Sequence, residues 1–120
     1  MQLVHYVTAS GVDVYQEWLD GLRDLRTRVR IARSVDRIRQ DNFGDHKFER
    51  NGVWEIRLDF GPGYRIYLAK DGDRLIVLFG GGTKRGQQRD IDRAKVLHAE
   101  YKARKKAAAA AARKSGKHKR

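Results

Sequence analysis

The stretch from Val53 to Gln88 decides the fold; it reads VWEIRLDFGPGYRIYLAKDGDRLIVLFGGGTKRGQQ. Apolar and charged residues alternate in its first eight positions and again after the Gly61-Pro62-Gly63 turn, which predicts two strands with one face toward a core. Asp71-Gly72 is a strong hairpin signal, and the apolar run Leu75–Phe79 after it predicts a strand covered on both faces. Three consecutive antiparallel strands are therefore expected.

The expected strand register gathers polar side chains on one solvated face of this sheet. They are Glu55, Arg57, Arg65 and Tyr67. A glycine-rich strap, Gly80–Gln88, follows the third strand and would bring Lys84 and Arg85 to the rim of the same face. Because guanidinium groups match phosphate oxygens in a bidentate fork, we expect this face to grip a phosphodiester.

The flanking segments complete an α+β domain. Alternation over Leu3–Val7 predicts a first strand, and two helices follow, the second from about Arg23 to Asp41. A short extended lead-in at 46–50 precedes the three strands, and a last helix is expected from Gln88 to about Arg104. The order β-α-α-β-β-β-α predicts a small antiparallel sheet with both N-terminal helices packed on one face.

The second helix has two contrasting faces. Its expected buried stripe recurs at three- and four-residue steps: Leu25, Val29, Ala32, Val35 and Ile38. Its other face carries Arg23, Arg26, Arg28, Arg30, Arg33, Arg37 and Arg39. These arginines are either an ordinary solvated helix face or an outer wall that contacts nucleic acid or an acidic partner segment.

Most of the net charge of +12 lies at the C-terminal end of the 120 residues. Nine of the 27 basic residues, and no acid, follow Tyr101, which leaves 18 basic against 15 acidic residues before that point. Such a tail attracts polyanions without sequence preference. We expect one domain over residues 1–102 and a basic Ala/Lys-rich tail over 103–120, either a frayed helix or disordered.

Composition also excludes several classes of protein. The chain has no cysteine, so disulfides and thiolate metal sites are ruled out, and its four histidines are too scattered for a metal site. We therefore expect no metal and no cofactor. No apolar run approaches the roughly 20 residues of a membrane span, and the N-terminus shows no export signal, so a cytoplasmic protein without membrane contact is expected.

The polar face suits RNA cleavage, because RNA supplies its own nucleophile, the 2′-hydroxyl. A protein then has only to position the strand and to neutralise charge on the phosphate. Arg57, Arg65 and Lys84 are the candidates for that role. Glu55 is either a proton acceptor or an ion-pair partner that orients Arg57, and Tyr67 either stacks on a base or packs across the strands.

Four motifs together resemble the RelE/ParE toxin superfamily, in particular the HigB-related branch of addiction-module killer proteins. They are WL-GL-D over Trp18–Asp24, FGD over Phe43–Asp45, GPGYRIY over Gly61–Tyr67, and GGGTK-Q-DI-A over Gly80–Ala94. The resemblance covers roughly residues 4–102. It implies a RelE-like fold and a small type II toxin that forms a hetero-oligomer with a helix-turn-helix antitoxin.

RelE-like members are metal-independent endoribonucleases that cleave mRNA in the ribosomal A site and leave a 2′,3′-cyclic phosphate. The basic residues of their catalytic set fall here on Arg57, on Arg65, and on Lys84 or Arg85. Further RNA contacts are expected from Arg85, Tyr67, Lys47, Arg50 and Gln88. The resemblance thus implies an mRNA interferase that inhibits translation.

Two positions depart from the family pattern. Glu55 stands where the family has a lysine, and Gln87 and Gln88 replace the tyrosine or histidine that many members carry after the last strand. The general acid and base are therefore unassigned. Two alternatives stay open: a ParE-like toxin that acts on DNA gyrase, and a non-enzymatic nucleic-acid-binding protein that works through its basic tail.

Overall fold

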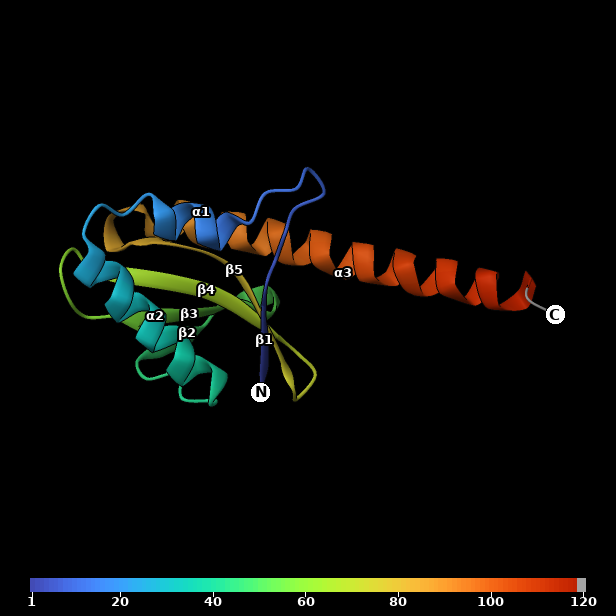
Figure 1. Ribbon diagram of the computed structural model, residues 1–120, viewed down its shortest axis with the longest axis horizontal. Helices are drawn as coiled ribbons and strands as arrows, with labels where there is room; N and C mark the ends of the chain where they lie inside the picture. The colour runs from blue at the N-terminus through green and yellow to red at the C-terminus, as the bar shows by residue number, and fades with distance from the viewer. Residues whose placement is uncertain (119–120) are drawn as a thin grey trace.

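The computed structural model describes residues 1–118 and shows a five-stranded mixed sheet enclosed between helices (Figure 1). The strands are β1 (Gln2–His5), β2 (His46–Phe48), β3 (Trp54–Leu58), β4 (Tyr64–Asp71) and β5 (Leu75–Thr83). The helices are α1 (Val14–Asp20), α2 (Leu25–Arg39) and α3 (Gln87–His118), with short 3-10 turns η1 (Arg50–Gly52) and η2 (Lys84–Gly86). The predicted α+β class is confirmed.

The strand order is β1-β5-β4-β3-β2, and β1 runs parallel to β5 whereas all other neighbours are antiparallel. The prediction of a wholly antiparallel sheet is therefore wrong at β1. After β1 the chain crosses through α1 and α2 to the far edge, and the strands that follow alternate in direction on the way back. β5 thus arrives beside β1 in the same direction. The expected lead-in at 46–50 forms β2 and the start of η1.

Helices α1 and α2 pack on the same face of the sheet, as predicted. One core cluster joins Tyr15 of α1 and Ile31 of α2 to the alternating apolar residues of β3, β4 and β5. The expected stripe of α2 is wrong at Leu25, Val29 and Ala32: Leu25 is 65% and Val29 42% exposed, and Ala32 is exposed as well. Burial begins at Ile31, so only the second half of α2 lies over the sheet.

Helix α3 covers the other face. Its residues Ile91, Ala94 and Leu97 form a second core cluster with side chains from β4 and β5. The helix then continues past the sheet into solvent, so most of the expected tail over 103–120 is helical up to His118 (Figure 1). Residues 119–120 lie outside the described part of the chain. None of the described helices is long and apolar enough to cross a membrane.

The glycine-rich strap is the end of a strand. β5 runs on through Gly80–Thr83 and pairs with β4, with a register shift between Tyr67 and Leu68. Glycine is needed at Gly81 because Trp18 of α1 lies directly against the backbone there, and a Cβ atom at this position would overlap the indole ring. Close approach of α1 to β5 therefore depends on Gly81.

We predict that Gly81→Ala lowers the free energy of unfolding by about 1–3 kcal/mol, because the new methyl group overpacks the contact with Trp18. Urea denaturation monitored by tryptophan fluorescence measures the change. Gly21→Ala is the matched control: a Cβ there meets its nearest atoms at 3.4 Å and φ is −74°, so stability should be unchanged or slightly higher. Equal stability of Gly81→Ala and wild type would contradict the packing argument.

Candidate functional site

The β3–β4 register places the predicted polar residues on one face of the sheet. Arg57 is paired with Arg65, and Glu55 with Tyr67, so the four residues share one face as the alternation predicted. Lys47 of β2 is paired with Glu55 and so belongs to the same face. This is the face that α3 begins to cover, which makes the first residues of α3 part of the same site.

Glu55 is the centre of this group of side chains. Its side chain is fully buried and its Oε1 accepts a hydrogen bond of 2.9 Å from Nε of Arg57. Nε2 of Gln87, at the start of α3, lies 2.9 Å from Oε1 and 2.7 Å from Oε2. Nε of Arg65 is 3.9 Å from Oε1. One carboxylate therefore holds two guanidinium groups and the first turn of α3; we call these four residues the Glu55 cluster.

The polar residues of β3 and β4 were expected to lie in solvent, and for most of them this expectation is wrong. Arg65 is 8% exposed and Tyr67 1% exposed, because α3 closes over them. Charge and polarity in the sequence suggested exposure, whereas in the structure Glu55 accepts hydrogen bonds from Arg57 and Gln87, and the charge of Arg65 lies 3.9 Å from the same carboxylate. Arg57 remains accessible, with a side chain 33% exposed. The hydrogen bond to Glu55 raises the pKa of Arg57 above its ordinary value, which keeps its charge fixed.

Burial bears on both open roles. Glu55 accepts hydrogen bonds from Arg57 and Gln87, which is the geometry of an ion-pair partner. Tyr67 packs in the second core cluster with Val77 and Phe79, so its ring has no face free for a nucleobase. Burial, reinforced by the charge of Glu55, raises the pKa of the Tyr67 hydroxyl above its ordinary value.

Lys84 lies beside the Glu55 cluster, and Arg85 does not. The N–H of Lys84 donates to the carbonyl oxygen of Gly63 at 2.7 Å. A Cβ built on Gly63 would lie 3.4 Å from Cβ of Lys84 and 3.5 Å from Nη1 of Arg65, so the base of the Lys84 side chain and the Arg65 guanidinium both lie next to Gly63. Arg85 instead lines an open groove of about 730 Å³ beside Trp18. Two cations at the surface, Arg57 and Lys84, thus flank the buried Arg65.

The remaining predicted RNA contacts are exposed but scattered. Lys47 lies 3.5 Å from a carboxylate oxygen of Glu49. Arg50 lies in η1. Gln88 donates to Oδ1 of Asp92 at 3.0 Å. Over residues 1–118 no group of three or more His, Asp or Glu side chains is arranged to hold a metal ion.

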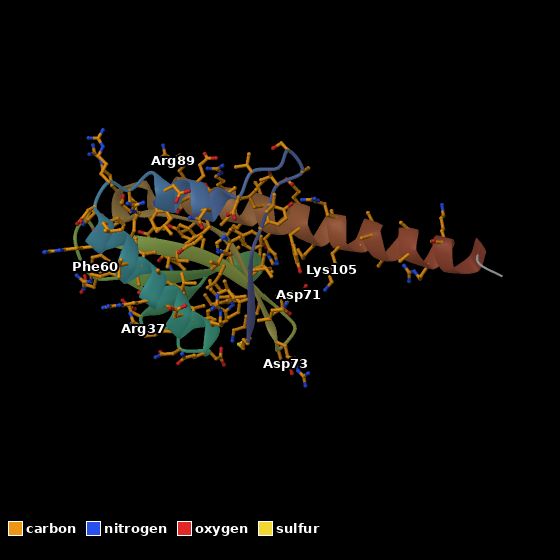
Figure 2. The ribbon with its side chains drawn as sticks, in the orientation of Figure 1. Arg37, Phe60, Asp71, Asp73, Arg89 and Lys105 are labelled. Carbon is orange, nitrogen blue, oxygen red and sulfur yellow. The ribbon has the colours of Figure 1, made fainter. Side chains whose placement is uncertain are left out.

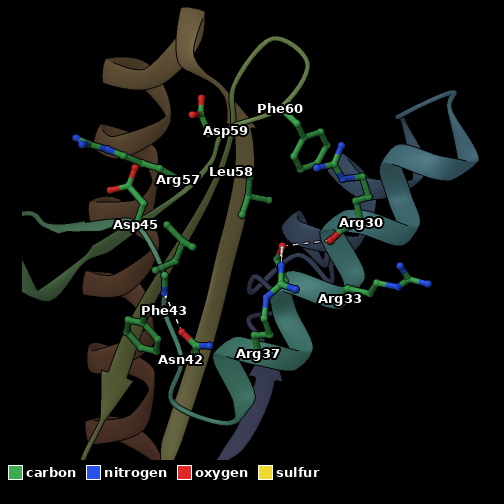
Figure 3. Close-up of a pocket in the computed structure, with 13 residues that line it drawn as sticks. Arg30, Arg33, Arg37, Asn42, Phe43, Asp45, Arg57, Leu58, Asp59 and Phe60 are labelled. Atoms are coloured by element: carbon green, nitrogen blue, oxygen red, sulfur yellow. Dashed lines mark hydrogen bonds between the residues drawn. The ribbon is translucent and has the colours of Figure 1, made fainter.

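A second surface feature was not foreseen: a groove of about 360 Å³ between α2 and the outer edge of β3 (Figure 3). Away from α2, its lining combines the apolar side chains of Phe43, Ile56, Leu58 and Phe60 with the charged side chains of Asp45, Arg57 and Asp59. Its α2 wall carries Arg30, Arg33 and Arg37, and Figure 3 shows Arg30 over Phe60. We call this the α2–β3 groove.

The arginines of the α2–β3 groove lack carboxylate partners within the described residues. The guanidinium of Arg30 is 3.8 Å from the ring centroid of Phe60, and Nη2 of Arg37 donates to Oγ of Ser34 at 3.1 Å. The sequence had identified the arginine face but not the groove, because the position of α2 against β3 depends on the tertiary packing.

The fold and the Glu55 cluster define a small α+β protein with a buried ion cluster at one end of its sheet. No protein-family model matches the sequence. The chain is similar to an uncharacterized protein of Haemophilus influenzae, with 40% identity over 86 residues that cover 72% of this chain and 87% of the relative. The chain therefore belongs to the family of that Haemophilus protein.

We predict that Glu55→Gln lowers the free energy of unfolding by about 3 kcal/mol, because it leaves buried Arg65 without a compensating charge. Chemical denaturation of the purified protein measures the change. Asp59→Asn is the control: this carboxylate follows β3 but is exposed, and its loss should cost less than about 0.5 kcal/mol. Equal effects of the two substitutions would show that the Glu55 cluster does not stabilise the fold.

Proposed function

We propose that this protein is the toxin of a type II toxin–antitoxin system and cleaves mRNA as a metal-independent endoribonuclease. The observation that carries the proposal is that Arg57 and Arg65 are cross-strand partners and that the backbone and Cβ of Lys84 lie beside the same end of the β3–β4 hairpin. The element order, with two helices on one sheet face and the last helix on the other, supports assignment to the RelE-like fold. We also infer a cytoplasmic site of action on ribosome-associated mRNA.

The proposed reaction uses the RNA's own 2′-hydroxyl as the nucleophile. Its oxygen attacks the adjacent phosphorus, the bond to the 5′-oxygen breaks, and a 2′,3′-cyclic phosphate and a free 5′-hydroxyl result. Negative charge builds up on the non-bridging oxygens in the transition state, where the accessible cations Arg57 and Lys84 stabilise it. Arg65 adds positive potential from below, and Glu55 orients Arg57 so that its outer guanidinium nitrogens face the phosphate.

One observation favours the alternatives. Glu55 and Tyr67 are both enclosed, so neither reaches a substrate as a proton donor or acceptor. A ParE-like toxin that acts on DNA gyrase, or a non-enzymatic nucleic-acid binder, would use the same basic surface and would need no proton transfer. The cellular process that stops first, protein synthesis or DNA synthesis, distinguishes RNA cleavage from action on DNA gyrase.

We predict that Arg57→Gln and Lys84→Gln each reduce RNA cleavage by a factor of about 10² or more, because each removes one cation that stabilises the transition state. Cleavage of a labelled mRNA by purified protein, with the 3′ end tested for a cyclic phosphate, is the measurement. Lys84 is exposed, so its substitution should change thermal stability little, whereas Arg57→Gln also removes a charged partner of buried Glu55 and should lower it. Arg26→Gln, on the exposed face of α2, is the control and should cleave at the wild-type rate.

Cleavage that persists at the wild-type rate in both variants would contradict the proposed site. In cells, pulse labelling after induction separates the targets. Protein synthesis should stop first if mRNA is cleaved, whereas an early stop in DNA synthesis with continued translation would favour the gyrase alternative.

The α2–β3 groove is the proposed docking site for an acidic segment of the helix-turn-helix antitoxin. Its apolar side chains suit a polypeptide better than a phosphate backbone, and its three arginines without carboxylate partners complement acidic residues.

We predict that Arg33→Glu with Arg37→Glu weakens antitoxin binding at least about tenfold, because two favourable charge pairs become repulsive. The antitoxin for this test is the protein encoded by the neighbouring reading frame. Calorimetric titration of each variant with that protein measures the dissociation constant. Arg23→Glu with Arg26→Glu makes the same charge change outside the groove and should bind nearly as wild type. Equal weakening in both pairs would assign the effect to net charge and not to the groove.

A further inference from the structure

Helix α3 carries a row of cations along one side, which we call the α3 stripe. Its members are Lys95, Lys102, Lys106 and Arg113. At 3.6 residues per turn they fall within an arc of about 40° and extend over roughly 27 Å of helix. None of them forms an ion pair with another described residue. The stripe is therefore a continuous, uncompensated line of positive charge.

The stripe lies on the side of α3 that faces η1 and the end of β4, where Lys102 and Lys106 lie near Lys70 and Asp71. His98, one turn before Lys102, contacts the carbonyl oxygen of Asn51 in η1 at 2.9 Å. Gln88 lies on the same arc at the start of the helix, next to Gln87 of the Glu55 cluster. The α3 stripe thus begins beside the candidate cleavage site and leads away from it.

Contacts on both sides fix the direction in which α3 leaves the fold. Nη1 of Arg104 donates to the carbonyl oxygen of Val7 at 2.7 Å. Nζ of Lys105 donates to the carboxylate of Asp71 at 2.7 and 2.8 Å, and Figure 2 shows this pair where the helix passes the end of the sheet. These two cations are paired within the fold, whereas those of the stripe are free.

The composition of the projecting helix selects its partner. Ala107–Ala112 contributes no large apolar side chain, so the helix has no face to insert into a lipid surface or to pack in a coiled coil. Its small side chains let a partner approach the helix backbone closely. A line of lysine and arginine without an apolar face is typical of contact with a phosphate backbone.

We infer that the α3 stripe binds the phosphate backbone of RNA next to the cleavage site, so that the projecting helix acts as a second contact for an extended RNA. The choice of RNA over DNA rests on the proposed function; the stripe itself rests on geometry and charge. The contact adds affinity that does not depend on sequence and that weakens as salt rises.

The test uses the full chain and an RNA oligonucleotide with 2′-O-methyl groups throughout, which the protein cannot cleave. Fluorescence anisotropy gives the dissociation constant at several salt concentrations. Lys102→Gln with Lys106→Gln and Arg113→Gln should weaken binding at least about tenfold at low salt. It should also lower the slope of log K against log salt by about 2 to 3, because each substituted cation leaves one phosphate without its counter-charge.

The matched control keeps the net charge and moves two cations to the opposite face of the helix. It combines Lys106→Ala with Ala108→Lys and Arg113→Ala with Ala111→Arg. If the position of the cations on the helix matters, this variant also binds RNA more weakly than the wild-type protein. Circular dichroism should show that its helicity is unchanged. Wild-type affinity in the control would overturn the inference, since charge alone would then suffice.

Two further results also bear on the inference. A DNA duplex of the same length is the second probe. If the wild-type protein binds this DNA as tightly as the RNA, and the stripe variants lose affinity for both to the same extent, the assignment to RNA is overturned. Because the probe is not cleaved, weak binding by the stripe variants would support the stripe even if the wild-type protein proves to have no nuclease activity. Conversely, wild-type binding by all variants would overturn the stripe and leave the cleavage proposal standing.

Discussion

A carboxylate buried between one end of the sheet and the start of α3 is the constraint on which this structure depends. Removing the charge of Glu55 from water is costly unless it is paired and fully hydrogen-bonded. Arg57 and Gln87 supply hydrogen bonds to Glu55, and Arg65 adds a second positive charge at 3.9 Å. The same interaction therefore closes α3 onto the sheet and sets the direction of the guanidinium groups in the candidate site.

Helix α3 links stability to the proposed activity. Its middle buries Ile91, Ala94 and Leu97 against the sheet, and its first turn completes the Glu55 cluster. Its distal half leaves the fold and carries cations that the core does not use. A substitution that loosens the first turn of α3 should therefore affect both unfolding and the position of Arg57. Core and site cannot be varied independently in a domain of this size.

The sequence predicted the strand register well, because a period of two leaves little freedom in which residues share a face. Arg57 opposite Arg65 followed directly from that alternation. Burial of Glu55 could not be predicted in the same way, since a charged residue in an alternating strand is usually solvated and nothing local shows that α3 will cover it. The parallel pairing of β1 and the α2–β3 groove likewise depend on long-range packing that no local pattern encodes.

The central claim is that the Glu55 cluster marks the point where an RNA phosphate lies. Nuclear magnetic resonance of the arginine Nε–H groups tests it directly, with an RNA that carries a 2′-deoxy group at the cleavage position to prevent reaction. The account predicts that the signals of Arg57 and Arg65 shift first and saturate with the RNA concentration. Shifts confined to Arg30, Arg33 and Arg37 of the α2–β3 groove, with Arg57 and Arg65 unchanged, would contradict it.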